Sequence, residues 1–192
     1  MVLLWASLLG LLIGLLRRGT VANLSHLRLR SAWLILIAFL IQFAIFPTGL
    51  FESPIKSGIP YWHLASYGAL VLFALLNWRE RALRPMALGL ISNFVVIAVN
   101  QGYMPVSLDA LEISGAHNTE AALRATGIHG NVILMCTQPE IEHCKQTYLN
   151  LLGDSFGLPS WLPAARPISI GDIFLALGLI YFLQRKMRYT SL

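Results

Sequence analysis

Residues 86–104 read MALGLISNFVVIAVNQGYM, a stretch without a charged side chain. A helix that crosses a bilayer needs about 20 predominantly apolar residues, so this stretch is long enough for one crossing. Four further stretches are similarly apolar: 2–20, 31–50, 59–78 and 168–185. Charged residues enter only the first and the last of these. The sequence therefore predicts an all-α, polytopic membrane protein with five transmembrane helices.

The basic residues fall into alternate gaps between these segments. Ten of the 14 Lys and Arg residues lie there with a single acid, Glu80. The ten are Arg17, Arg18, Arg28, Arg30, Arg79, Arg81, Arg84, Arg185, Lys186 and Arg188. Because cytoplasmic loops carry an excess of Lys and Arg, we expect these gaps on the cytoplasmic side. The N-terminus is then outside, the C-terminus is cytoplasmic, and residues 105–167 form an extracytoplasmic insertion.

The composition agrees with this placement. Of the 192 residues, 56% are apolar and only 12% are charged, whereas soluble domains have about 25% charged residues. The net charge of +5 is carried by bases that flank apolar spans, where they meet phospholipid headgroups. We therefore expect a multi-pass protein of the cytoplasmic membrane, in contact with lipids and with no nucleic-acid partner.

Two patterns inside the segments indicate helix packing. Ala6, Gly10 and Gly14 recur every four residues, and such a small-residue face lets another helix approach closely. The neighbour is either a helix of this chain or one of another protein. Asn93 and Asn100 lie seven residues apart, so they share one helix face and we expect them to point inward. They serve either interhelical hydrogen bonding or ligand binding.

The insertion after the fourth segment is too long for a structureless loop, so we expect it to fold. Capping signals predict three short helices. These are Leu108–Ile113, capped by Ser107; a helix from Asn118 or Thr119 through Arg124, closed by Gly127; and a helix from Thr137 to about Leu152, stopped by Gly153.

The chain has two cysteines, Cys136 and Cys144, both in this insertion. An extracytoplasmic position favours a disulfide. A helix starting at Thr137 would hold them about 10 Å apart, beyond the roughly 7 Å that a disulfide tolerates, so the bond needs a later helix start. The first alternative to a disulfide is that both cysteines are free thiols. The second is a metal site that includes both cysteines, although the sequence around them lacks a metal-ligand spacing.

Two acids and one histidine are the candidates for chemistry. Asp154 and Asp172 both fall near the outer face, and two carboxylates sharing a site can hold one proton and activate water. Asp172 also fits a purely structural role, since Ser169 and Asp172 form a helix-capping pattern. His63 lies at the outer end of the third segment, where it is either an interfacial histidine or a tetrapyrrole ligand. The sequence predicts no metal site and no other cofactor.

Three short motifs carry a family resemblance: Asn100–Val106, Leu152–Asp154 and Ile168–Asp172. With the Arg17-Arg18-Gly19 pattern they resemble domain-of-unknown-function family 5317, a family of small bacterial membrane proteins without an assigned activity. A fainter similarity is to lipoprotein signal peptidase, an intramembrane aspartic protease, in Asn100-Gln-Gly102 and in the Asp172 motif. The last motif has Ser and Gly where that family has Asn and Ala, and the helix order differs, so this is an analogy.

The sequence thus favours a non-enzymatic role, as an accessory or scaffold subunit of a larger bacterial membrane complex. The most specific version of this hypothesis is that the complex is an energy-transducing one. The protein would interact with other membrane-protein subunits. The alternatives are an intramembrane aspartyl hydrolase that uses Asp154 and Asp172, and a membrane protein that binds a small molecule or lipid at Asn93 and Asn100.

Overall fold

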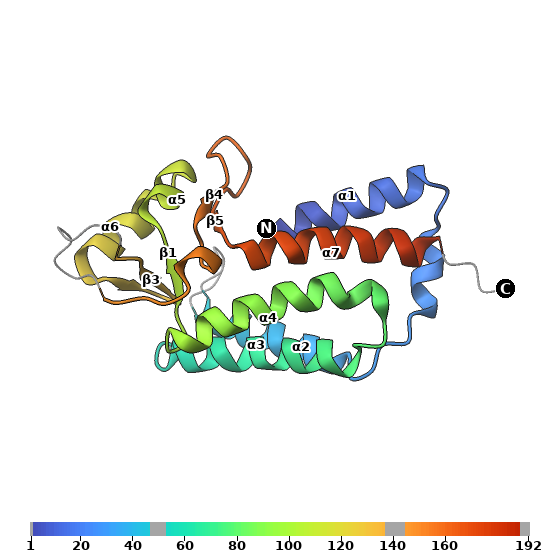
Figure 1. The fold of residues 1–192 in the computed structure, drawn as a ribbon, viewed down its shortest axis with the longest axis horizontal. Helices are drawn as coiled ribbons and strands as arrows, with labels where there is room; N and C mark the ends of the chain where they lie inside the picture. The colour runs from blue at the N-terminus through green and yellow to red at the C-terminus, as the bar shows by residue number, and fades with distance from the viewer. Residues whose placement is uncertain (1, 47–52, 137–144, 189–192) are drawn as a thin grey trace.

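Five long helices lie side by side in the computed structural model, and a smaller unit sits at one end of them (Figure 1). The structure describes residues 2–46, 53–136 and 145–188. The long helices are α1 (Val2–Leu16), α2 (Trp33–Ile45), α3 (Ile59–Leu76), α4 (Arg84–Val99) and α7 (Ile170–Met187). The 3-10 helices η1 (Val21–His26) and η2 (Arg81–Leu83) lie in the connections from α1 to α2 and from α3 to α4. Each predicted segment overlaps one of these long helices, although α4 begins before its segment and α7 ends after its segment.

Four helices end earlier than the sequence predicts, α3 by only two residues, at Leu76. α1 stops at Leu16 because Arg18 adopts a positive φ of 62° and the Gly19 N–H turns back to the Gly14 carbonyl. α4 stops at Val99, before two residues with positive φ. α2 stops at Ile45, and residues 47–50 of the predicted segment lie outside the described residues.

Two helices in the described part of the chain are long and apolar enough to cross a membrane: Ile59–Leu76, and Arg81–Val99, which joins η2 to α4. α1 and α2 are apolar but have 15 and 13 residues. α7 has 18 residues, but these include Asp172, Arg185 and Lys186 near its ends. Length and composition thus support a spanning role for two of the five predicted helices.

Glycines bring α7 close to both α1 and α4. A Cβ atom on Gly10 would lie 2.9 Å from the Leu183 side chain, and one on Gly14 would collide with Met187. A Cβ atom on Gly89 would lie 2.5 Å from the Gly171 carbonyl oxygen. A larger residue would require the Leu183 or Met187 side chain to move at the first two positions, and the backbone to move at Gly89. The start of α7, which carries Asp172, is therefore held tightly against α4.

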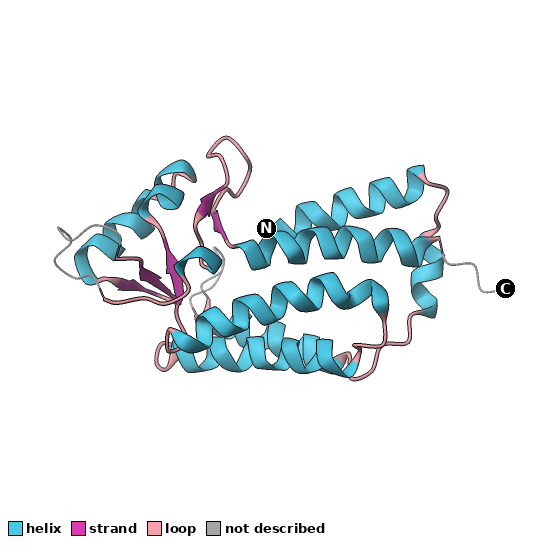
Figure 2. Cartoon of the chain, in the orientation of Figure 1, coloured by secondary structure: helices cyan, strands magenta, loops and turns pink. Residues whose placement is uncertain are grey.

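The smaller unit combines helices with short strands (Figure 2). Strands β1 (Met104–Val106), β3 (Val132–Leu134) and β2 (Ile128–His129) form a sheet in that order, with β1 parallel and β2 antiparallel to β3. Helices α5 (Leu108–Ile113) and α6 (His117–Thr126) connect β1 to β2. A second pair, β4 (Phe156–Gly157) and β5 (Pro167–Ile168), is antiparallel. The all-α prediction is therefore wrong for this unit.

Two of the three helices predicted in this unit are present. Ser107 caps α5 by accepting from the Ala110 N–H, and Gly127 ends α6 with a positive φ. The third prediction, Thr137–Leu152, is wrong for its described part: residues 145–149 are not helical, and a 3-10 turn η3 (Asn150–Leu152) follows. The side chain of Asn100 explains this, because it bonds both the N–H and the carbonyl of Tyr148 and so removes them from a helical ladder.

Candidate functional site

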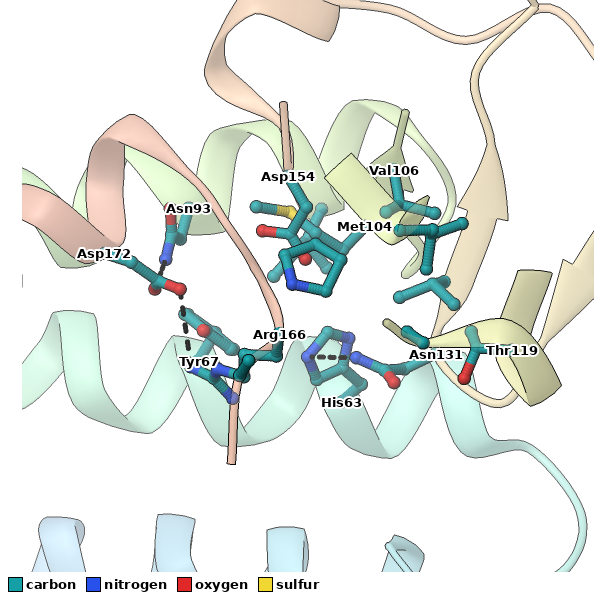
Figure 3. Close-up of a pocket in the computed structure, with 16 residues that line it drawn as sticks. His63, Tyr67, Asn93, Met104, Val106, Thr119, Asn131, Asp154, Arg166 and Asp172 are labelled. Atoms are coloured by element: carbon teal, nitrogen blue, oxygen red, sulfur yellow. Dashed lines mark hydrogen bonds and ion pairs between the residues drawn. The ribbon is translucent and has the colours of Figure 1, made fainter. Parts of the chain in front are cut away.

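A cavity of about 370 Å³ lies where the long helices meet the smaller unit (Figure 3). Residues from α3, α4 and α7 form one part of it, and residues from β1, α5, α6 and the segments around β3 and β5 form the rest. Its polar lining consists of His63, Tyr67, Asn93, Thr119, Asn131, Asp154, Arg166 and Asp172. The structure thus brings together the two acids and the histidine that the sequence singles out.

The segment after α4 fixes the position of His63. Gln101 and Gly102 have positive φ values, and a Cβ atom on Gly102 would collide with the Pro60 carbonyl, so the chain turns tightly against the start of α3. The Gly102 carbonyl lies 2.9 Å from His63 Nδ1. Because a carbonyl only accepts, Nδ1 carries the proton and Nε2 accepts from the Asn131 amide at 3.4 Å. A tetrapyrrole could be ligated only if that second contact broke.

The backbone of β1 holds Asp154 in place. The Asp154 N–H donates to the Pro105 carbonyl at 2.8 Å, and the Asp154 carbonyl accepts from the Ser107 N–H at 3.1 Å. A Cβ atom on Gly153 would lie 2.7 Å from the Pro105 oxygen, so only glycine fits there. The Asp154 carboxyl group reaches into the cavity (Figure 3). No side chain among the described residues donates a hydrogen bond to it.

The start of α7 places Asp172 in a closed network with α4. Ser169 Oγ accepts from the Asp172 N–H at 3.0 Å and donates to Asn93 Oδ1 at 2.9 Å. Asn93 Nδ2 in turn donates to Asp172 Oδ1 at 2.9 Å. The second oxygen, Oδ2, pairs with Arg166 Nη2 at 3.4 Å. Gly171 leaves room for this network, because a Cβ atom there would collide with the Asn93 side chain. Both oxygens of Asp172 are therefore partnered.

The two acids differ in their electrostatic surroundings. Burial raises the pKa of Asp154 to about 8, and the negative charge of Asp172 acts in the same direction, while the positive charge of Arg166 opposes them. The Asp154 side chain keeps some accessible surface because it faces the cavity. At neutral pH Asp154 is therefore mainly protonated, whereas the negative charge of Asp172 is compensated by its ion pair with Arg166.

The three motifs that carry the family resemblance meet at this cavity: Asn100–Val106 positions His63, Leu152–Asp154 supplies Asp154, and Ile168–Asp172 supplies Asp172. Residues 26–184 match the model of a family of unknown function, DUF5317. The chain belongs to the DUF5317 family. The match spans every polar residue that lines the cavity. No curated protein and no solved structure matches the chain. DUF5317 brings no activity with it, so the function has to be argued from the cavity.

Other residues singled out by the sequence lie elsewhere. Ala6, Gly10 and Gly14 are buried, and both glycines face α7 of the same chain. Asn100 does not line the cavity but anchors the loop at Tyr148.

The predicted disulfide cannot be followed in the structure. It joins Cys136 to Cys144, and Cys144 lies outside the described residues. Within the described part of the chain, no group of three or more His, Cys, Asp or Glu side chains is arranged to hold a metal ion.

Four polar residues of the cavity were not predicted as site residues: Tyr67, Thr119, Asn131 and Arg166. Thr119 was considered only as a helix cap. Arg166 is one of three scattered bases in the insertion, with Arg124 and Lys145, but its place six residues before Asp172 was a usable signal. Asn131 follows Gly130 in the turn between β2 and β3, and a Gly-Asn pair between two short apolar runs is a hairpin signal. Tyr67 has no such signal in the sequence, because a tyrosine inside an apolar helix is expected to be a core residue.

Proposed function

We propose that this DUF5317 protein spans the membrane five times and binds a small, positively charged ligand in the cavity at its outer end. The observation that carries the proposal is the carboxyl group of Asp154, which is deep in the molecule, lines the cavity and has no hydrogen-bond partner among the described residues. A polar group that faces a cavity and has no protein partner needs water or a ligand to satisfy it. The cavity volume is within the range of about 300–1,000 Å³ that is typical of small-molecule sites.

The membrane part of the proposal is supported by the surfaces of the long helices. Every one of them exposes large apolar side chains: Leu4, Leu8 and Leu12 on α1; Leu36, Phe39 and Phe43 on α2; Leu72 and Leu75 on α3; Leu88 and Val95 on α4; Phe174 and Leu177 on α7. An apolar surface of this extent is unusual for a protein in water and suits lipid. The basic gaps favour a cytoplasmic position for the end opposite the cavity, which places the cavity on the outer face.

The charge of the proposed ligand follows from the balance of charged groups that line the cavity. Asp172 and Arg166 compensate each other, and Asp154 avoids a net negative charge by holding a proton. A cationic group beside Asp154 would favour its ionised form, so the cation replaces the proton. Asn131, Thr119 and Tyr67 add neutral hydrogen-bonding groups that can orient the rest of the ligand. Binding should therefore release one proton and strengthen as the pH rises.

Hydrolysis by the two acids is the second candidate, because Asp154 and Asp172 line one cavity and have unlike environments. The contacts favour binding over hydrolysis. In an aspartic dyad the two carboxyl groups share a proton, whereas both oxygens of Asp172 are taken by Asn93 and Arg166. The accessory-subunit role stays a prediction, and it has lost one support, since the small-residue face of α1 is occupied by α7.

Binding can be tested with simple cations. Detergent-purified protein is unfolded by heat at pH 6 and pH 9 in methylammonium, tetramethylammonium or guanidinium chloride, with sodium chloride at equal concentration as reference. We expect at least one organic cation to raise the unfolding temperature above the reference, and more so at pH 9. The variant Asp154→Asn should lose this gain. An equal gain in the variant, or no gain with any of the three cations, would contradict the proposal.

A further inference from the structure

We propose that the cytoplasmic end of the α1–α7 pair binds the phosphate group of an anionic phospholipid, in a hollow separate from the outer cavity. The hollow has a volume of about 460 Å³ and is lined by Arg17, Tyr181, Gln184, Arg185 and Arg188. This site rests on the proposed membrane insertion of the helices. It does not depend on what the outer cavity binds.

Three guanidinium groups from two helices converge on this hollow. Arg17 comes from the end of α1, and its Nη1 donates to Gln184 Oε1 on α7 at 2.6 Å, which fixes it at the edge of the hollow. A guanidinium has five N–H donors, so most of those on Arg17 are still available. Arg185 lies in the last turn of α7 and Arg188 directly follows that helix, and both are exposed. Arginine side chains bind phosphate oxygens in a planar, two-pronged geometry.

The charge of the hollow is not cancelled by an acid that lines it. The acid in the neighbouring loop is Glu80, and its carboxylate is ion-paired with Lys186 at 2.6 Å. Arg185 adds a weaker electrostatic attraction to Glu80, and neither Arg17 nor Arg188 forms an ion pair with a described residue. The hollow therefore carries excess positive charge and suits an anion.

An apolar strip on α7 favours a lipid over a free anion as the ligand of the hollow. Phe174, Leu177 and Tyr181 are all exposed, and their spacing of three and four residues puts them on one face of the helix. Arg185 and Arg188 continue that face. A phosphate at the arginines would thus have its acyl chains lying along the strip toward the membrane interior, with Tyr181 at the polar boundary, where tyrosine is common. Inorganic phosphate would use the arginines but not the strip.

Native mass spectrometry of the detergent-purified protein can measure this binding with dioleoyl phosphatidylglycerol as the probe. The test variant is Arg17→Gln with Arg188→Gln. The control variant is Arg79→Gln with Arg81→Gln, which removes the same charge at the same end from two exposed residues that do not line the hollow. Insertion is checked first, by retention of the protein in alkali-washed membranes, so that a failure of insertion is distinguished from a failure of this site.

We expect the test variant to bind phosphatidylglycerol roughly 30-fold more weakly than the wild type, and the control variant to change less than about threefold. In the wild type, zwitterionic dioleoyl phosphatidylcholine and short-chain dihexanoyl phosphatidylglycerol should both bind more weakly than the long-chain anionic lipid. Equal losses in the two variants would show only general attraction to the basic surface and overturn the proposal. Displacement of the lipid by millimolar inorganic phosphate would instead show a soluble-anion site, and would overturn it as well. The two wild-type lipid comparisons decide the matter even if the test variant does not fold.

Discussion

Replacing Asp154 by Asn should remove a large part of the dependence of stability on pH. The pKa of Asp154 is about 8 in the folded protein and ordinarily 3.8. Because the folded state binds this proton more tightly than the unfolded state, the stabilising contribution is fully present below about pH 4. It is lost as the pH rises toward 8, since the folded protein then has to bury a charge. Asparagine has nearly the same shape as the protonated acid and does not titrate.

The magnitude of this loss in unfolding free energy follows from the pH interval over which residue Asp154 is ionised only in the unfolded chain. Between pH 5 and pH 8 this is three pH units at ~1.4 kcal/mol each, or on the order of 4 kcal/mol for Asp154. Water entering the cavity would screen the charge, so half of this value is a reasonable lower expectation. About 2 kcal/mol corresponds to a change of about 4–8 °C in Tm for a chain of this size.

The assay is the thermal unfolding of detergent-purified protein between pH 5 and pH 9, followed by tryptophan fluorescence. The quantity to compare is Tm of the wild type minus Tm of Asp154→Asn, because other titrating groups cancel in that difference. We expect the difference to become more negative by at least about 4 °C as the pH rises from 5 to 9. The matched control is Glu112→Gln, at an exposed acid on α5, for which the difference should stay constant. Parallel curves for the wild type and Asp154→Asn would refute the reasoning.

Three further predictions follow from the same contacts. Asp172→Asn removes a negative charge that raises the pKa of Asp154, so the pH at which stability falls should move downward in the same assay; an upward move would contradict this. Gly89→Ala puts a Cβ atom against a carbonyl of α7 and should lower the unfolding free energy by about 1–3 kcal/mol in a denaturant titration. Gly68→Ala, the control, meets only an ordinary contact at 3.8 Å and should be nearly neutral. Equal effects of the two variants would argue against the close α4–α7 packing. Asn77→Ala removes three hydrogen bonds to backbone groups and should lower the unfolding free energy by about 2–3 kcal/mol. An unchanged unfolding free energy would show that Asn77 does not hold the loop before α2.

The elements that could be predicted from the sequence are those specified by local signals. The five long helices follow from continuous apolar stretches, and the ends of α5, α6 and α7 follow from Ser107, Gly127 and Ser169. The strands could not be predicted in the same way. Each has two or three residues, and β1 is separated from its partner β3 by 25 residues. Pairing over such a distance leaves no periodic signal in so short a stretch.

The site was predicted in part for the same reason. Asp154 and Asp172 each follow a glycine at a predicted helix boundary, so the sequence placed them near the outer face and suggested a pair. It could not show that Asp172 is bound by Asn93 while Asp154 is unpartnered, because this distinction depends on how α4, α7 and β1 pack. Within the sequence, Gly89 and Gly171 look like ordinary helix glycines, and only the α4–α7 contact shows why no larger residue fits.

The measurement that tests the central claim most directly is the protonation state of Asp154 itself. Infrared difference spectra recorded between pH 6 and pH 9 report the carbonyl band of a protonated carboxyl group. The account predicts a band that disappears with a midpoint near pH 8, is absent in Asp154→Asn, and also disappears at pH 7 when a stabilising organic cation is added. A spectrum of the wild type that equals that of Asp154→Asn throughout this range would show that Asp154 does not change its protonation state between pH 6 and pH 9, and the proposed exchange of a proton for a cation would then be wrong.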